Sequence, residues 1–280
     1  MQWQKAKTIL IVVFLLINLF LLYYLLPNRH TDSRQTLQYL TDALAKNEIH
    51  LRMDTLPETK DSIFVPEFSV PLLTEKQIEK LIVSPVKNEN GYTNSDNTVK
   101  LEFKSNEFSY ENSALENKKF RNVTVKNVVS KLEPYVKALG VEEYVYPVDI
   151  LEIQDEIVVE YAYRIENRKL FDSRLRFTVT KNGIRRIRGH LSVPDSKNGF
   201  SYSLSRLETI LMSLAQKKEE AITITNIELG YYFLSYTDAM VSQAIPVYRI
   251  TTQSGDILMD ARDGVETEER ILSRSGAGGN

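Results

Sequence analysis

Hydrophobic positions fall into one almost unbroken block near the start of the chain, residues 8–26, and into shorter periodic patterns beyond it. A helix over this block would be about 28 Å long, close to the thickness of the hydrocarbon core of a bilayer. The block has no charged residue and no polar stripe, whereas a helix that packs on the core of a soluble protein usually has a polar stripe. Trp3 before the block, and Tyr23 and Tyr24 near its end, suit the two membrane interfaces. The pattern predicts one transmembrane helix within the lipid bilayer.

The block should remain attached to the mature protein. No small-residue cleavage pattern follows it, and the chain has no cysteine that could carry a lipid. Lys5 and Lys7 precede the block and three basic residues lie beyond it, so the charge bias is nearly balanced. The shortness of the N-terminal flank, residues 1–7, favours a cytoplasmic N-terminus. We therefore expect a signal anchor of a single-pass cell-membrane protein whose C-terminal domain is extracytoplasmic.

Periodicity also predicts the elements that follow the block. Apolar residues spaced three and four apart indicate helices, and alternating residues indicate strands. Helices are expected at 32–47, 124–139 and 203–217, with a further helix beginning at the capping box of Thr74 and Gln77. Strands are expected at 49–53, 98–104, 107–111, 148–153, 157–166, 169–180, 184–193, 221–229, 231–236, 247–252 and 256–260. The proline-spaced residues 56–72 suggest an extended linker, and residues 274–280 a disordered tail.

These elements recur in the same order. A helix followed by an antiparallel meander occupies residues 124–194 and again residues 203–268, and a rougher copy begins near residue 36 within a membrane-proximal α+β region, residues 32–122. The Asn-Gly pair at residues 182–183 supports the meander, because it suits a tight hairpin turn. The predicted fold class is α+β: a single N-terminal transmembrane helix followed by an ectodomain of repeated helix-plus-antiparallel-meander subdomains.

Composition narrows the range of functions. Hydrophobic residues make up 42% of the chain and charged residues 26%, as in an ordinary folded domain. The net charge of -2 provides no basic field for nucleic acid. The lack of cysteine fits a bacterial surface protein and removes thiolate catalysis and cysteine metal sites. We expect no cofactor, no metal and no small-molecule substrate.

Residues with catalytic potential are sparse. The three histidines are far apart, and we find no metal-binding pair, P-loop, dinucleotide fingerprint or Gly-x-Ser-x-Gly elbow. Asp260 and Asp263 would suit Ca²⁺ or acid–base chemistry, but an ordinary turn at Asp263-Gly264 and a strand end at Asp260 explain them better, because no further ligands are spaced nearby. We therefore expect that this protein is not an enzyme. An anchored cell-wall enzyme would need both of these acids, together with another acid or His190, around a common pocket.

Two stretches of the predicted ectodomain suggest contact surfaces. A group of arginines falls on two neighbouring strands: Arg174, Arg176, Arg185, Arg186 and Arg188. It indicates either contact with lipid headgroups, teichoic acid or an acidic partner, or a solvated sheet face with paired acids. Residues 227–236 are rich in aromatics, which belong either to the core or to a protein-binding patch that would include Tyr231 and Tyr232.

A polar amide lies at the middle of the apolar block. An asparagine in mid-bilayer is unfavourable without a partner, and an interhelical hydrogen bond from it contributes about 0.6–2 kcal/mol. Asn18 is therefore either tolerated in a very apolar span or part of a partner-binding face. The residues that share its helical face, at spacings of three, four and seven, are Ile11, Phe14, Leu15, Leu22 and Leu25.

The N-terminal residues resemble those of a known family. The pattern Trp-x-Lys-x-Lys-Thr-Ile at residues 3–9, together with the uncleaved anchor and the chain length, is similar to the YycI family. Residues 246–264, PVYRITTQSGDILMDARDG, look like the strand pair of PepSY-like domains.

The resemblance implies a two-component regulatory protein of low-GC Gram-positive bacteria. Such a protein acts with a YycH-type protein on the sensor histidine kinase WalK, also called YycG, which controls cell-wall metabolism. Contact through transmembrane helices would give the Asn18 face a role. The alternatives are a PepSY-like ligand-binding or protease-inhibiting module, which would need a groove lined by Tyr231, Tyr232 and Phe233, and the anchored enzyme.

Overall fold

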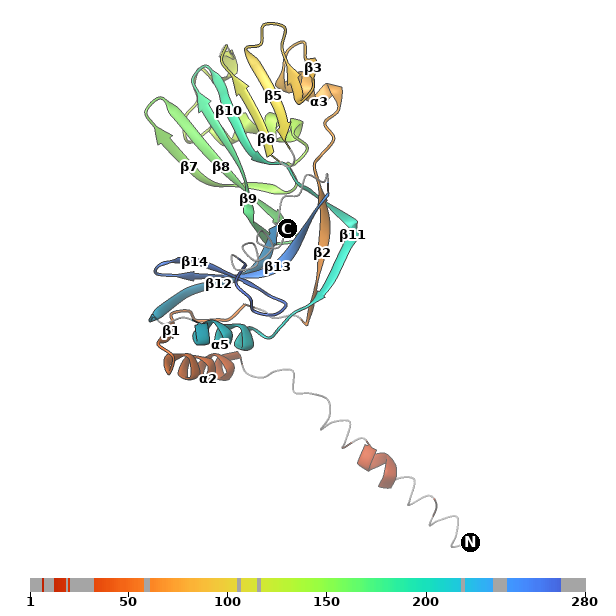
Figure 1. Cartoon of the computed structure of the whole chain (residues 1–280), viewed down its shortest axis with the longest axis vertical. Coiled ribbons are helices and arrows are strands. Elements are labelled where there is room, and N and C mark those ends of the chain that lie inside the picture. The colour runs from red at the N-terminus through yellow and green to blue at the C-terminus, as the bar shows by residue number, and fades with distance from the viewer. Residues whose placement is uncertain are drawn as a thin grey trace, which may run out of the picture.

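The computed structural model describes residues 7, 13–18, 20, 33–57, 61–104, 107–114, 117–217, 220–233 and 241–267. Over these residues the fold is mixed α+β and rich in sheet (Figure 1). Within the same residues no helix is long and apolar enough to cross a membrane. Most of the predicted span, residues 8–26, and the whole of the predicted tail, residues 274–280, lie outside the described part of the chain.

The helices of the folded part are α2 (Ser33–Ala45), α3 (Glu75–Leu81), α4 (Val128–Ala138) and α5 (Leu207–Lys217). The strands are β1 (Ile49–Leu51), β2 (Ser62–Ser69), β3 (Val86–Asn88), β4 (Gly91–Thr93), β5 (Val99–Lys104), β6 (Glu107–Asn112), β7 (Val145–Ile153), β8 (Glu156–Ile165), β9 (Arg168–Thr180), β10 (Gly183–His190), β11 (Val193–Ser203), β12 (Ile222–Phe233), β13 (Val241–Thr252) and β14 (Gly255–Asp260). They pair in the order β11-β2-β13-β12-β9-β10-β6-β5-β4-β3. Four strands lie off this path: β8 pairs with β9, β7 pairs with β8, β14 pairs with β13, and β1 pairs with β12.

The upper lobe in Figure 1 consists of β3–β10 with α3 and α4. Its strands are antiparallel, and alternate residues of β8 and β9, such as Val159 and Phe177, point into one core. Val128, Leu132 and Val136 form the apolar face of α4 and are buried in that core. The helices therefore cover one face of the sheet and leave the other face open.

The lower lobe has a core of its own. It contains β1, β12, β13 and β14 with α5 against the sheet and α2 beneath α5 (Figure 1). Leu40 and Leu44 of α2 and Leu211 of α5 are fully buried there, because apolar residues at helical spacing form one stripe on each helix. Strands β2 and β11 form a long ribbon beside both lobes.

The sequence predicts the local helices and hairpins well and the strands that pair over long distances poorly. Helices form inside the predicted ranges 124–139 and 203–217, and the predicted hairpins of β5–β6 and β9–β10 are present. Residues 56–72 are not simply a linker, because β2 lies within them and its alternate residues are buried. Strand β11 was not expected, and β12 is one continuous strand where two were expected.

Residues 32–122, expected as one membrane-proximal region, divide between the two lobes. Their first helix, α2, packs in the lower core, and β1 pairs with β12 there. Their later strands, β3–β6, extend the sheet of the upper lobe through the pairing of β6 with β10. The physical reason is that neither part buries enough apolar surface alone, so each completes a core built mainly by later residues.

Candidate functional site

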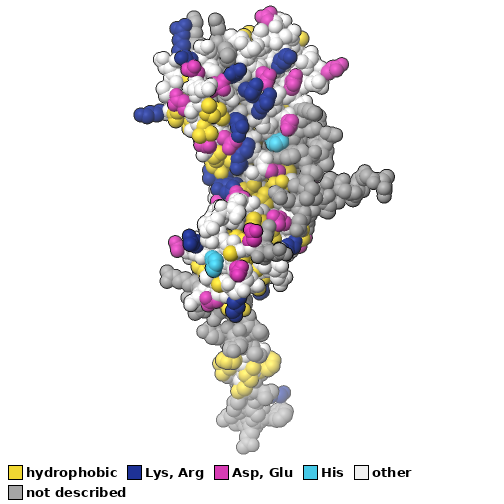
Figure 2. All heavy atoms as spheres, turned by 60° about the vertical axis from the view of Figure 1, so that its left-hand side comes forward, with side chains coloured by type: hydrophobic (Ala, Val, Ile, Leu, Met, Phe, Trp, Pro, Cys, Tyr) yellow, Lys and Arg dark blue, Asp and Glu magenta, His cyan; other side chains and the backbone are white. Residues whose placement is uncertain are grey.

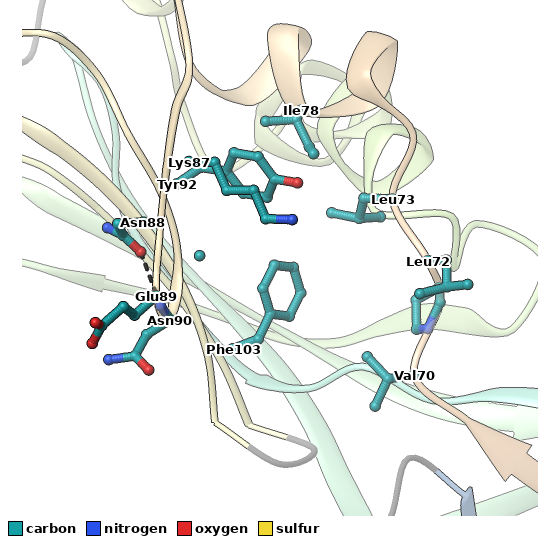
Figure 3. Close-up of a pocket in the computed structure, with 12 residues that line it drawn as sticks. Val70, Leu72, Leu73, Ile78, Lys87, Asn88, Glu89, Asn90, Tyr92 and Phe103 are labelled. Atoms are coloured by element: carbon teal, nitrogen blue, oxygen red, sulfur yellow. Dashed lines mark hydrogen bonds between the residues drawn. The ribbon is translucent and has the colours of Figure 1, made fainter.

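An apolar hollow lies at the β3 end of the upper lobe. After β2 ends, residues 70–73 lead into α3 and lie opposite the β3–β4 hairpin (Figure 3). The space between them is a cavity of about 340 Å³. We call it the apolar groove, and its lining residues are Val70, Pro71, Leu72, Leu73, Ile78, Lys87, Asn88, Glu89, Asn90, Gly91, Tyr92 and Phe103.

Local sequence signals build both walls of the groove. On one side the backbone N–H of Thr74 donates to the side-chain oxygen of Gln77 at 2.9 Å, which fixes the start of α3 and places Ile78 in the core. On the other side the Asn90 N–H donates to the Asn88 side chain at 3.1 Å and tightens the hairpin turn. Gly91 lets β4 approach β5, since a Cβ at this position would lie 2.0 Å from the Leu101 carbonyl oxygen.

The interior of the groove is apolar and its rim is exposed. Figure 3 shows Phe103, Leu73 and Ile78 pointing toward the hollow, with the Lys87 side chain reaching across it beside Tyr92. Leu72 at the rim is 87% exposed, which is unusual for a leucine in a folded domain. The arrangement suits an apolar side chain of a partner protein, with a carboxylate of that partner near Lys87.

The five arginines lie on the open face of the upper sheet or at its β-bulge, and each has an acidic neighbour. Arg176 donates to Glu160 at 2.9 Å, and Arg188 donates to Glu111 at 2.8 Å. The hydrogen bond from Arg188 lowers the pKa of Glu111 below its ordinary value. Figure 2 shows basic and acidic side chains interspersed over this part of the molecule. This geometry is that of a solvated, internally paired face, in which the other three ion pairs are Arg174–Glu160, Arg185–Glu156 and Arg186–Glu111.

A β-bulge explains why these arginines do not alternate cleanly in the sequence. The register of β10 against β9 shifts between Ile184 and Arg186, so Arg185 is an extra residue. The bulge returns Ile187 to the buried face after Ile184. Counting residues in the sequence cannot reveal the bulge, because it belongs to the strand pair.

The aromatic stretch belongs mainly to the core. Tyr231 and Phe233 are buried in the upper core, and the Tyr231 hydroxyl lies 3.4 Å from the Phe64 carbonyl oxygen. Burial raises the pKa of Tyr231. The side chain of Tyr231 is therefore not available as a surface contact, and only Tyr232 of the predicted pair is partly exposed. These three residues do not line a groove of the kind that a PepSY-like ligand-binding module would need.

The acids weighed as a catalytic pair have structural partners. Asp260 is completely buried and accepts hydrogen bonds from Arg262 Nε at 2.9 Å and Nη2 at 2.6 Å. Asp263 accepts the Val265 N–H at 3.1 Å, as a turn residue does. His190 lines a separate hollow with two glutamates, and burial lowers its pKa. The structure does not bring His190 together with the two aspartates around one pocket.

The predicted transmembrane face is described only in part. Phe14, Leu15 and Asn18 are helical and exposed, and the Asn18 amide donates to the Phe14 carbonyl oxygen at 3.0 Å. This bond uses one of the two amide N–H donors within the helix, so the second N–H and the side-chain carbonyl oxygen are the groups that a neighbouring helix would meet. Ile11, Leu22 and Leu25 lie outside the described residues.

Comparison with known proteins yields structural likenesses at low identity. No family model matches the sequence, and no curated protein matches it. An uncharacterized protein from Eubacterium rectale aligns over 82% of this chain and 98% of its own, at 12% identity and a TM-score of 0.49. The YpeB C-terminal domain of Bacillus megaterium aligns over 84% and 95%, at 8% identity and a TM-score of 0.34. YycH from Bacillus subtilis aligns over 74% and 51%, at 10% identity and a TM-score of 0.40. Membership of the YycI family therefore stays a prediction from the N-terminal residues.

Proposed function

We propose that this chain is a membrane-anchored accessory regulator of a sensor histidine kinase, WalK or YycG, and that it acts through protein–protein contact together with a YycH-type protein. The resemblance of residues 3–9 to the YycI family supports the identity of the partners. The observation that carries contact as the mode of action is the apolar groove, because it is open, lined by aromatic and aliphatic side chains, and bordered by the exposed Leu72.

The groove contributes to regulation only if it binds one state of the kinase assembly better than another. A contact of equal strength with the active and inactive states shifts no equilibrium. The anchor confines the chain to the plane of the membrane, which raises the effective concentration of the upper lobe beside its partners. A modest contact at the groove is then enough to bias the kinase, and the Asn18 face supplies a second contact within the bilayer.

The first prediction concerns the rim of the groove. Leu72→Asp should reduce co-purification of the kinase or of the YycH-type protein by about tenfold, because it places a charge where an apolar side chain is buried on binding. The matched control is Val83→Asp, which changes a valine that is 81% exposed and does not line the groove. Kinase-dependent transcription is measured in the same cells, with membrane levels of each variant checked by immunoblot.

Equal behaviour of the two variants in both assays would show that the groove is not the contact. The transmembrane part is tested separately by replacing Asn18, Phe14 and Leu22. If kinase output and association are unchanged in those variants as well, helix-mediated regulation is excluded.

A further inference from the structure

A second hollow, of about 330 Å³, lies on the open face of the upper sheet, over β7, β8, β9 and β10. The pairing of these strands aligns the side chains of this face in rows that run across the sheet. In one row Asp149 lies beside Glu160, Glu160 beside Arg176, and Arg176 beside Arg188. Two neighbouring acids are therefore followed by two neighbouring arginines, and all four line the hollow.

The next row is apolar at its β7 end. Leu151 lies beside Val158, which is followed by Thr178 and Arg186. Leu151 and Ile153, on the same face of β7, are 49% and 55% exposed and line the hollow with Val158. Figure 2 shows hydrophobic side chains beside the charged ones on this lobe. The hollow thus combines an acidic and apolar side, over β7 and β8, with a basic side, over β9 and β10.

The charges at the two ends of the first row are not balanced within the sheet face. Asp149 is exposed and has no ion-pair partner among the residues that the structure describes. At the other end Arg186 and Arg188 share one carboxylate, that of Glu111. Negative charge is therefore left over on β7 and positive charge on β10, with an ion pair of β8 and β9 between them.

The two arginines of the row are also placed where they repel each other. Arg176 and Arg188 lie directly opposite on β9 and β10, and like charges in such a pair are unfavourable. Within the described part of the chain each donates to a glutamate through Nη2 alone, so further guanidinium N–H groups remain for a ligand. A carboxylate between them would accept these hydrogen bonds and offset the repulsion.

We propose that this hollow binds a short peptide with free termini, its ammonium group near Asp149 and its carboxylate near Arg176 and Arg188. The outer two of four neighbouring strands are about 14 Å apart. Three extended residues span about 10 Å, so a tripeptide leaves only a gap that the side chains at the two ends can reach across. Its apolar side chains would lie toward its amino end, because Leu151 and Val158 are on the Asp149 side of the hollow.

Simpler ligands match only part of the hollow. An anion would satisfy the arginines and be repelled by Asp149, whereas a cation would do the reverse. An uncharged apolar molecule would leave both charged ends without a partner. The site is also separate from the proposed kinase contact, since the hollow and the apolar groove share no lining residue. Its test therefore stands apart from that of the proposed function.

The test uses equilibrium dialysis of the full-length chain in neutral detergent micelles against the tritiated tripeptide Leu-Leu-Ala, with empty micelles as the blank. We expect saturable binding to the protein. Acetylation of the amino end, or amidation of the carboxyl end, should each weaken binding by about fivefold, because each removes one charge from an exposed ionic contact. The reversed peptide Ala-Leu-Leu should bind more weakly than Leu-Leu-Ala, since its leucines lie toward the arginines.

Variants of the protein assign each end of the peptide. Asp149→Asn should weaken binding of Leu-Leu-Ala by about fivefold and leave the acetylated peptide unaffected, because the charge that Asp149 meets is already absent. Arg188→Gln should act in the same way on the carboxyl end, and leave the amidated peptide unaffected. The matched control is Glu152→Gln, which removes an exposed charge from the opposite face of β7 and should have little effect.

The proposal is wrong if Leu-Leu-Ala shows no saturable binding above the blank, or if the capped peptides bind as well as the free one. Equal losses in Glu152→Gln and Asp149→Asn would also contradict it. Tighter binding of the acetylated peptide would assign the hollow to a simple anion instead. Circular dichroism of each variant separates loss of binding from loss of fold.

Discussion

At the scale of single residues, two buried tyrosines differ in how their hydroxyl groups are satisfied. The Tyr163 hydroxyl donates to the His190 carbonyl oxygen at 2.7 Å. The Tyr248 hydroxyl lies in the lower core and has no hydrogen-bond partner among the described residues. Both rings are fully buried, and burial raises the pKa of each hydroxyl. The two positions therefore compare a satisfied buried hydroxyl with an unsatisfied one.

Removal of these two hydroxyls should affect stability differently. Tyr163→Phe should lower the free energy of unfolding by about 1 kcal/mol, because it removes the hydrogen bond from a buried hydroxyl to the His190 carbonyl oxygen. Tyr248→Phe should leave it unchanged or raise it by up to about 1 kcal/mol, because the hydroxyl is desolvated without compensation. Urea unfolding of the full chain in detergent measures both. If Tyr248→Phe destabilises the protein as much as Tyr163→Phe does, the Tyr248 hydroxyl has a partner.

At the scale of elements, sequence periodicity predicts most of the helices and hairpins because these depend on neighbours within about a dozen residues. The stripe of α4 and the Asn-Gly hairpin between β9 and β10 are examples. The β2–β11 ribbon was not predicted, because its strands are far apart in sequence and β2 contains a proline. Only one stretch of sequence could have indicated the apolar groove, Val-Pro-Leu-Leu at residues 70–73, and that stretch is equally typical of a buried core.

The continuity of β12 depends on one glycine. At Gly230 a Cβ would lie 2.5 Å from the Lys169 carbonyl oxygen and 2.6 Å from the Phe171 ring, because β9 passes close to β12 there. Gly230 was expected to separate two strands, but it allows one strand to continue past a neighbouring backbone. A single sequence does not distinguish these two uses of glycine.

Replacement of this glycine should destabilise the protein through a steric clash. Gly230→Ala should cost about 2–4 kcal/mol of unfolding free energy, since backbone atoms of β9 would have to move. Gly255→Ala is the comparison, because its φ of 133° disfavours a side chain while nothing lies within 4 Å of the added Cβ. That variant should cost about 1 kcal/mol from backbone conformation alone. Thermal unfolding ranks the pair, and a reversed order would contradict the close approach of the strands.

At the scale of the whole molecule, an ion-pair group joins the two lobes where β9 meets β12. Lys169 on β9 donates to Glu228 on β12 at 2.8 Å, and Arg249 on β13 also pairs with Glu228. Arg249 in turn lies over the Phe171 ring of β9, 4.7 Å from its centroid. Burial alone would raise the pKa of Glu228, but the hydrogen bonds from Lys169 and Arg249 hold it below its ordinary value. The junction between the lobes is therefore partly electrostatic.

Acid should weaken this junction. The folded protein binds the Glu228 proton less readily than the unfolded chain does, so the stabilising contribution is complete above the unfolded pKa and is lost as the pH falls below about 4.3. Glu228→Gln should lower stability at neutral pH and reduce the steepness of its decline between about pH 5 and pH 3. Unfolding measured across that range checks the sign. An identical pH profile in both proteins would remove Glu228 from the acid response.

The two contact surfaces of the proposed function lie far apart in the sequence, since the apolar groove adjoins β3 and the Asn18 face precedes the folded part of the chain. A molecule occupied at both surfaces is a bivalent adaptor that links two different proteins. Such adaptors have an optimum dose: scarcity leaves partners unlinked, and excess places each partner on a separate adaptor. Overproduction of this chain would then impair the same pathway as its deletion.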